Sequence, residues 1–144
     1  ITVRPDDIKA AVIWGGVVGT YDDLMNNWAR RVPFQPSQRE MALRNRRRAE
    51  IIAKYGTPKD NPGFWNLLDP NFFLSDVKAP VQIHIGGSDE EVPPDFSGGL
   101  YNRLKEKGKT VELYTYPGAD HNISGASFNI AEQRSIDFFN KYLK

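Results

Sequence analysis

Apolar residues gather into three short runs that predict β-strands. The first, KAAVIWGGVVG at residues 9–19, is apolar almost throughout, as is typical of a parallel strand covered by helices on both faces. The second, VQIHIGG, occupies residues 81–87. The third, TVELYTY at 110–116, alternates apolar and polar side chains as a strand near a sheet edge does. The pattern therefore predicts a small parallel sheet with interior strand residues at Ala11–Trp14.

Helix signals separate and follow these runs. Ser37 and Glu40 have the spacing of a capping box, and Gly56 is placed to end the arginine-rich helix that they begin. Residues 94–107 start with proline in the first turn and repeat apolar side chains every four residues. A last helix is expected over about 124–143. Strands alternating with helices predict one α/β domain over residues 1–144.

Residues 20–75 do not fit this alternation. Several prolines deny a long helix at both ends of the segment. Besides the arginine-rich helix, short helices are expected after a possible cap at Thr20 or Asp22 and near Phe64–Leu68. The segment is nevertheless rich in aromatic side chains, so we expect it to be a cap or an insertion that covers a pocket. The candidates for an apolar substrate pocket are Trp28, Phe34, Phe64, Trp65 and Phe72.

An acid and a histidine follow the second and third predicted strands. Parallel strands joined by a helix end at the same edge of a sheet, so Asp89 and His121 are expected to lie together there, where ligands of such sheets bind. Glu90 and Glu91 are alternative acids, but their place along a turn favours solvent. His84 falls on the opposite sheet face and is expected to be a packed core residue. Two histidines on opposite faces argue against a shared metal ion, so no metal site is expected.

The sequence around this pair resembles α/β-hydrolase-fold serine hydrolases, specifically the dienelactone-hydrolase and prolyl-oligopeptidase-like enzymes. The acid turn Gly-x-x-Asp-x-x-Val-Pro of these enzymes is similar to residues 86–93, and their histidine loop Tyr-Pro-Gly-x-x-His is similar to residues 116–121. The likeness is strong over residues 77–144 and implies the C-terminal half of such a domain, with three parallel strands, flanking helices and a helical cap. Residues 9–19 resemble the strand that follows the nucleophile elbow.

The resemblance implies a triad in the chain order Ser, Asp, His. Asp89 would orient the imidazole, and His121 would take the proton of the serine and return it to the leaving group. No serine of this chain lies in a Gly-x-Ser-x-Gly elbow, so the nucleophile is expected upstream of Ile1. The implied reaction is cleavage of carboxylic esters, or of peptides, through an acyl-enzyme, without a cofactor. The alternative is a non-catalytic interaction module with a hydrolase-like fold.

The composition of the chain argues against nucleic acid and membranes as partners but does not identify a partner. Nineteen basic and eighteen acidic residues nearly cancel, which leaves no global field for nucleic acid, and no apolar run approaches the ~18 residues of a membrane span. The arginines at 44 and 46–48 could suggest nucleic acid, but a solvated helix face is the preferred interpretation. The chain lacks cysteine, so both redox compartments are permitted and localisation stays open.

The first predicted strand has nothing before it to pair with. An uncovered apolar strand edge is an aggregation hazard, and the sequence opens without methionine or a signal peptide. We therefore expect the N-terminal half of the same protein to pair with the strand at residues 10–14. A chain without that half, and so without its serine and oxyanion hole, is expected to be inactive alone.

Overall fold

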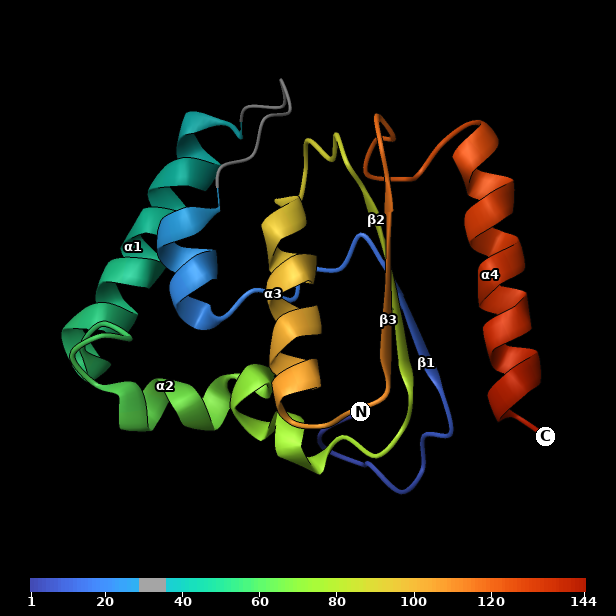
Figure 1. The fold of residues 1–144 in the computed structure, drawn as a ribbon. Helices are drawn as coiled ribbons and strands as arrows, with labels where there is room; N and C mark the ends of the chain where they lie inside the picture. The colour runs from blue at the N-terminus through green and yellow to red at the C-terminus, as the bar shows by residue number, and fades with distance from the viewer. Residues whose placement is uncertain (29–35) are drawn as a thin grey trace.

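The computed structural model describes residues 1–28 and 36–144 (Figure 1). Strands and helices alternate after an N-terminal stretch that has no regular structure. In chain order the elements are β1 (Ala11–Trp14), the π-helix η1 (Asp23–Asn27), α1 (Gln38–Tyr55), α2 (Pro62–Leu68), the 3-10 helix η2 (Pro70–Asp76), β2 (Val81–Gly86), α3 (Pro94–Glu106), β3 (Val111–Tyr116) and α4 (Ala126–Tyr142).

The three strands form one parallel sheet in the order β1, β2, β3. All six residues of β2 are buried, because this strand has a neighbour on each side and a helix over each face. Figure 1 shows α3 on one face of the sheet and α4 on the other. The predicted α/β class, with three parallel strands and flanking helices, is confirmed, and β3 lies at an edge as its alternating pattern indicates.

The face of the sheet toward α3 carries the main hydrophobic core. Val81 and Ile83 of β2 are fully buried and pack in one cluster with Leu100 and Leu104 of α3. Residues four apart share a helix face, so the leucine spacing that predicts this helix also aims it at the sheet. Burying a side chain of this size contributes about 1.5–3 kcal/mol. This layer therefore fixes α3, and with it the loop between β2 and α3.

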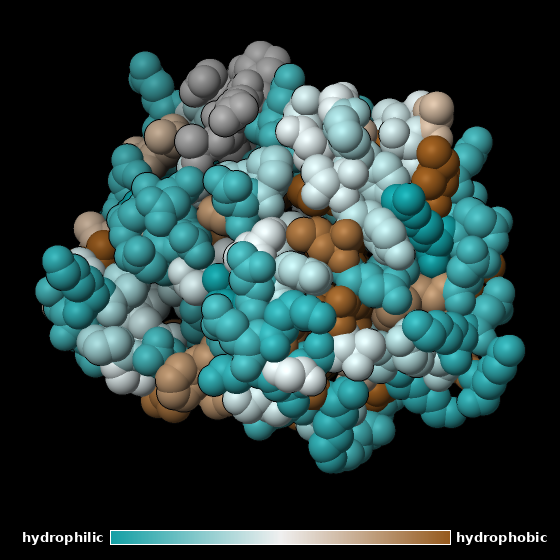
Figure 2. Space-filling view, in the orientation of Figure 1, coloured by the Kyte–Doolittle hydropathy of each residue, from teal (hydrophilic) through white to brown (hydrophobic). Residues whose placement is uncertain are grey.

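Helix α1 begins and ends where the sequence predicts. The Ser37 hydroxyl accepts a hydrogen bond from the Glu40 N–H, and the Glu40 carboxylate accepts one from the Ser37 N–H, which completes the capping box. None of the helix residues is buried, and Arg46 pairs with Glu50 along the helix surface. Figure 2 shows this side of the molecule, at the left, as largely hydrophilic. The arginines of α1 therefore form a solvated face.

The face of the sheet toward α4 holds a buried polar network around His84, which is fully buried. Its Nδ1 lies 2.8 Å from the Tyr116 hydroxyl and its Nε2 lies 2.7 Å from Oε1 of Gln82. The Gln82 amide N–H donates to the Glu112 carboxylate at 2.8 Å, and Arg134 donates to the Tyr116 hydroxyl at 3.2 Å. The core position predicted for His84 is confirmed.

The partners of this network fix the tautomer of His84. Because the Gln82 amide nitrogen is turned to Glu112, its oxygen faces Nε2, so Nε2 carries the proton. Nδ1 then accepts the Tyr116 O–H. Burial, reinforced by the nearby Arg134 guanidinium and opposed by Glu112, lowers the pKa of His84 to about 4. His84 is therefore neutral in the folded chain at neutral pH.

We expect the stability of the chain to fall on mild acidification. The pKa of His84 is about 4 when folded and about 6.5 when exposed, so the unfolded state binds more protons between these values. The free energy of unfolding is therefore full above pH 6.5 and decreases as the pH falls toward 4, by up to about 3 kcal/mol. Urea denaturation at pH 7, 5.5 and 4.5 measures this decrease.

A pair of histidine variants assigns the effect. His84→Gln removes the titrating ring and keeps a hydrogen-bonding side chain, so its stability should change less over this pH range. His121→Gln removes the partly exposed histidine instead, and comparison of the two variants shows which ring carries the pH dependence. An undiminished pH dependence in His84→Gln would show that another group is responsible.

Candidate active site

Asp89 stands in a tight turn just past the end of β2. The turn is closed by the Asp89 N–H, which donates to the Gly86 carbonyl at 3.2 Å. One carboxylate oxygen, Oδ1, accepts hydrogen bonds from the Glu91 N–H at 2.9 Å and the Val92 N–H at 2.8 Å. The side chain has no exposed surface. The backbone N–H groups therefore replace water around a buried acid and fix the direction of its second oxygen.

His121 stands in the loop between β3 and α4. The loop folds back on itself through the Ala119 N–H, which donates to the Tyr116 carbonyl, and the Ser124 N–H, which donates to Oδ1 of Asp120. Ile123 is fully buried and has a φ of 53°, a left-handed conformation that a β-branched residue rarely adopts. Such strain costs on the order of 1–3 kcal/mol and persists only where the surroundings impose it.

The two loops bring Asp89 and His121 into direct contact. Oδ2 of Asp89 lies 2.9 Å from Nδ1 of His121. An ionised carboxylate only accepts hydrogen bonds, so Nδ1 donates and Nε2 is left as the basic nitrogen. The side chain of His121 is 29% exposed, and no hydrogen bond reaches Nε2 from the described residues. The arrangement holds the imidazole through Nδ1 and leaves Nε2 without a hydrogen-bond partner among the described residues.

Gly86 allows the acid turn and the histidine loop to meet. A Cβ at this position would lie 2.0 Å from the Asp120 carbonyl oxygen and 2.5 Å from that of Ala119. The Gly87 and Ser88 N–H groups donate to the Tyr116 and Ala119 carbonyls at 2.8 and 2.9 Å, which ties the two turns together. The distance between the acid and the histidine therefore depends on a backbone contact that only glycine permits.

Gly15, directly after β1, makes the second close approach to the pair. Its φ is +52°, and a Cβ there would lie 2.9–3.0 Å from the imidazole ring of His121. The imidazole ring of His121 therefore packs directly against the backbone of Gly15. The Gly15-Gly16 pair after an apolar strand is the signal from which this contact could have been predicted.

No serine of the described residues is hydrogen-bonded to the histidine of the pair. All seven serines lie in the part of the chain that the structure describes, and none of their hydroxyls hydrogen-bonds to His121 there. Ser88 is next to Asp89 in sequence, but it is exposed, and Ser135 belongs to the His84 network on the α4 side. The site as described contains an acid and a base without a serine partner.

The aromatic candidates for a substrate pocket are scattered. Trp28 contacts the acid turn, and Phe34 lies outside the described residues. Phe64 stacks on Tyr55 at a ring distance of 4.1 Å, and Phe72 is 59% exposed. Among the described candidates Trp28 is the one bonded to the acid turn, and the pocket itself stays a prediction.

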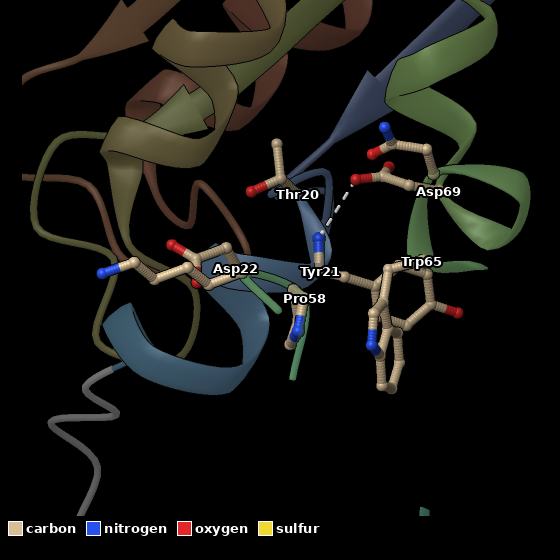
Figure 3. A pocket seen from close by; sticks show the side chains of 8 residues that line it. Thr20, Tyr21, Asp22, Pro58, Trp65 and Asp69 are labelled. Carbon is tan, nitrogen blue, oxygen red and sulfur yellow. Dashed lines mark hydrogen bonds between the residues drawn. The ribbon is translucent and has the colours of Figure 1, made fainter. Parts of the chain in front are cut away.

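Trp65 lines a separate cavity of about 370 Å³ (Figure 3). Its ring lies 5.4 Å from that of Tyr21, and the Tyr21 N–H donates to the buried carboxylate of Asp69 at 3.1 Å. This contact joins the segment after β1 to the start of η2.

No cluster of three or more His, Asp or Glu side chains suited to a metal ion occurs in residues 1–28 and 36–144. Nor does any helix within those ranges have the length and apolar character to cross a bilayer.

A parallel sheet with helices on both faces, and with an acid and a histidine paired beyond two strand ends, is the arrangement of the C-terminal portion of an α/β-hydrolase. The prolyl oligopeptidase family matches residues 12–144, which is nearly the whole chain. The chain belongs to this family.

Parts of individual relatives and solved structures are similar to this chain. The uncharacterized peptidase YuxL of Bacillus subtilis (strain 168) is 25% identical over 122 residues, covering 74% of this chain and 18% of the relative. A structure of an acylaminoacyl peptidase in complex with Z-Gly-Gly-Phe-chloromethyl ketone is 28% identical, with a TM-score of 0.51 over 61% of this chain and 15% of the other. Esterase 2 of Thermogutta terrifontis is 19% identical, with a TM-score of 0.48 over 54% of this chain and 32% of the other. The chain therefore spans less than a third of each of these relatives.

We expect Gly86→Ala to disrupt the site through the backbone. The added methyl group would overlap the Asp120 carbonyl, so the histidine loop must move, at a cost of about 3 kcal/mol. Thermal unfolding measures the loss, and amide chemical shifts of residues 116–123 report the displacement.

Gly98→Ala is the matched control, because a Cβ at that helical position meets nothing within 4 Å. Alanine there should leave the midpoint unchanged or raise it slightly, since alanine favours a helix more than glycine does. Equal effects of the two variants would contradict the role of Gly86.

Proposed function

We propose that this chain supplies the acid and the base of a serine hydrolase that cleaves peptides or carboxylic esters through an acyl-enzyme. Nε2 of His121 removes the proton from a serine hydroxyl as the serine attacks the carbonyl carbon, and then gives that proton to the leaving amine or alcohol. Asp89 holds the imidazole in the required tautomer and stabilises its protonated form. In the second half of the reaction His121 activates a water molecule in the same way.

The observation that carries this proposal is the 2.9 Å contact between Oδ2 of Asp89 and Nδ1 of His121. An acid that orients the base through one nitrogen, and so leaves the other nitrogen free, is the arrangement that activates a nucleophile. The Asp89 side chain is buried, whereas the His121 side chain is partly exposed. Substrate therefore has access to the basic nitrogen, while water is kept from the carboxylate.

The nucleophilic serine is proposed to come from a segment outside residues 1–144. The relatives extend well beyond the part that this chain matches, which leaves room for a Gly-x-Ser-x-Gly elbow and an oxyanion hole. Strand β1 is at one edge of the sheet, with β2 as its neighbour among the described strands. We propose that the segment with the serine pairs with this edge, so that its strand also ends near His121.

An apolar cavity beside β1 supports the same placement. It has a volume of about 430 Å³, and its lining includes Ile13, Val18 and Leu100. A hydrophobic surface beside an open strand edge is suited to a covering helix. We propose that residues 20–75 form the cap over the substrate.

Peptides are the better supported substrates. The family is that of prolyl oligopeptidase, and both YuxL and the acylaminoacyl peptidase carry the name of a peptidase. Esters share the acyl-enzyme chemistry and have the better leaving group, so an activated ester is a sensitive probe of the same site.

We expect the 144-residue chain alone to show no hydrolysis of p-nitrophenyl acetate or of peptide p-nitroanilides that depends on His121. Without a serine and an oxyanion hole the pair lacks the group that attacks and the donors that stabilise the intermediate. Release of p-nitrophenol or p-nitroaniline by the chain and by its His121→Ala variant is the measurement. Turnover that His121→Ala abolishes would overturn the proposal that the nucleophile lies outside the chain.

In a polypeptide that also contains the upstream segment, Asp89→Asn should lower kcat by about 10⁴-fold, because the amide no longer stabilises the required tautomer. Glu90→Gln is the control, since Glu90 is exposed beside Asp89 and should be close to wild type. A larger loss of kcat in Glu90→Gln than in Asp89→Asn would show that Glu90 is the acid of the site.

Failure of any serine to react with a fluorophosphonate probe in that polypeptide would favour the non-catalytic interaction module.

A further inference from the structure

The indole of Trp28 is hydrogen-bonded to the turn that holds the acid. Its Nε1–H donates to the Glu91 carbonyl oxygen at 2.8 Å, between residues 63 positions apart in the sequence. Trp28 follows the π-helix η1 and therefore reaches the acid turn from the segment after β1. This bond connects an aromatic side chain to backbone that itself contacts Asp89.

The peptide group between residues 91 and 92 links the two interactions. Its C=O belongs to Glu91 and accepts the Trp28 N–H, and its N–H belongs to Val92 and donates to Oδ1 of Asp89 at 2.8 Å. Oδ2 of the same carboxylate accepts from Nδ1 of His121 at 2.9 Å. A continuous series of hydrogen bonds thus runs from the indole to the imidazole.

Each bond in such a series strengthens the next. A donor at the carbonyl end of a peptide group polarises its N–H, and the effect is larger where water is excluded. Asp89 has no exposed side-chain surface, and Val92 is buried as well. The Trp28 bond therefore both fixes the orientation of the 91–92 peptide and increases its donation to Asp89.

The packing around Trp28 holds the indole in place. Its ring lies edge-on to Phe96, with a ring distance of 6.4 Å, and Phe96 is buried in the first turn of α3. Gly19 passes close to the same Phe96 ring, since a Cβ there would lie 2.9 Å from it. The start of η1 is fixed by reciprocal bonds between Thr20 and Asp23.

We propose that Trp28 is a positioning residue for the Asp89–His121 pair, acting through the 91–92 peptide. The proposal rests on the function proposed above for that pair, and it extends that function to a residue that sequence reasoning placed only in an aromatic substrate pocket. A tryptophan used only for packing needs its ring. A tryptophan that positions the acid turn also needs its N–H.

Trp28→Phe tests this distinction, because it keeps an aromatic ring and removes the N–H. Trp65→Phe is the matched control: its indole N–H donates to the Gly56 carbonyl at 3.1 Å, so the same group is lost without any bond to the acid turn. The chain has two histidines, which makes the imidazole N–H region of a nuclear magnetic resonance spectrum simple to assign.

In Trp28→Phe we expect the Nδ1–H proton of His121 to move upfield and to exchange with water about fivefold faster, the factor that corresponds to one neutral hydrogen bond. His84 should be unaffected, and Trp65→Phe should match wild type. Where Trp28→Phe does not fold, replacement of Trp28 by β-(3-benzothienyl)alanine keeps the bicyclic ring and removes only the N–H. An unchanged His121 proton in a folded variant of either kind would overturn the proposal.

The measurement does not need a nucleophile, so it separates the two proposals. If Asp89→Asn also leaves the His121 proton unchanged, the pair itself fails in solution and the proposed function falls with it. If Asp89→Asn shifts that proton and Trp28→Phe does not, only the role of Trp28 is wrong. In the polypeptide with its serine, Trp28→Phe should lower kcat about tenfold with KM nearly unchanged, whereas loss of a pocket wall would raise KM.

Discussion

The site depends on the contact between two backbone turns at the end of the sheet. Parallel strands β2 and β3 bring the turns to the same edge, but strand neighbours alone leave side chains several ångströms apart. Gly86 removes the remaining distance, because its missing side chain lets the Asp120 and Ala119 carbonyls pass directly over the β2 strand end. The acid and the histidine can then share a hydrogen bond while the acid stays buried.

Most of the fold could be predicted from the sequence because its signals are local. The capping box at Ser37 and Glu40, the glycine at 56 and the leucines at 100 and 104 each act within one or two turns of chain. The strand–helix–strand order then places Asp89 and His121 at one edge without further information. His84 could also be assigned to the opposite face, because side chains alternate along a strand.

Contacts between segments far apart in the chain could not be predicted in the same way. An indole is a donor wherever it lies, so the bond from Trp28 to the Glu91 carbonyl follows from the path of η1 and not from a motif. The same holds for the apolar side chains of α2 and η2. Their hydrophobic character suggests burial, yet Leu67 and Phe72 are 69% and 59% exposed.

Sequence patterns also say little about which polar groups of a core satisfy one another. His84, Tyr116 and Arg134 come from three elements, and only their mutual distances show that the ring is neutral and which nitrogen carries its proton. Tyr116 belongs to both systems: its hydroxyl joins the His84 network, and its carbonyl accepts from the Gly87 and Ala119 N–H groups of the acid turn and the histidine loop. Tyr116 therefore connects the α4 face of the sheet to the histidine loop by hydrogen bonds, and Ile123 and Ala131 pack in the same buried cluster.

The hydrogen bonds that set the acid–base geometry all lie between described residues of this chain. Asp89 is held by the amides of its own turn, His121 by Asp89 and by its loop, and the turn by Trp28. These bonds leave Nε2 of His121 as the one side-chain polar atom of the pair without a hydrogen-bond partner among the described residues. The order of the pair therefore comes from the backbone contact at Gly86 and from the amides of the acid turn.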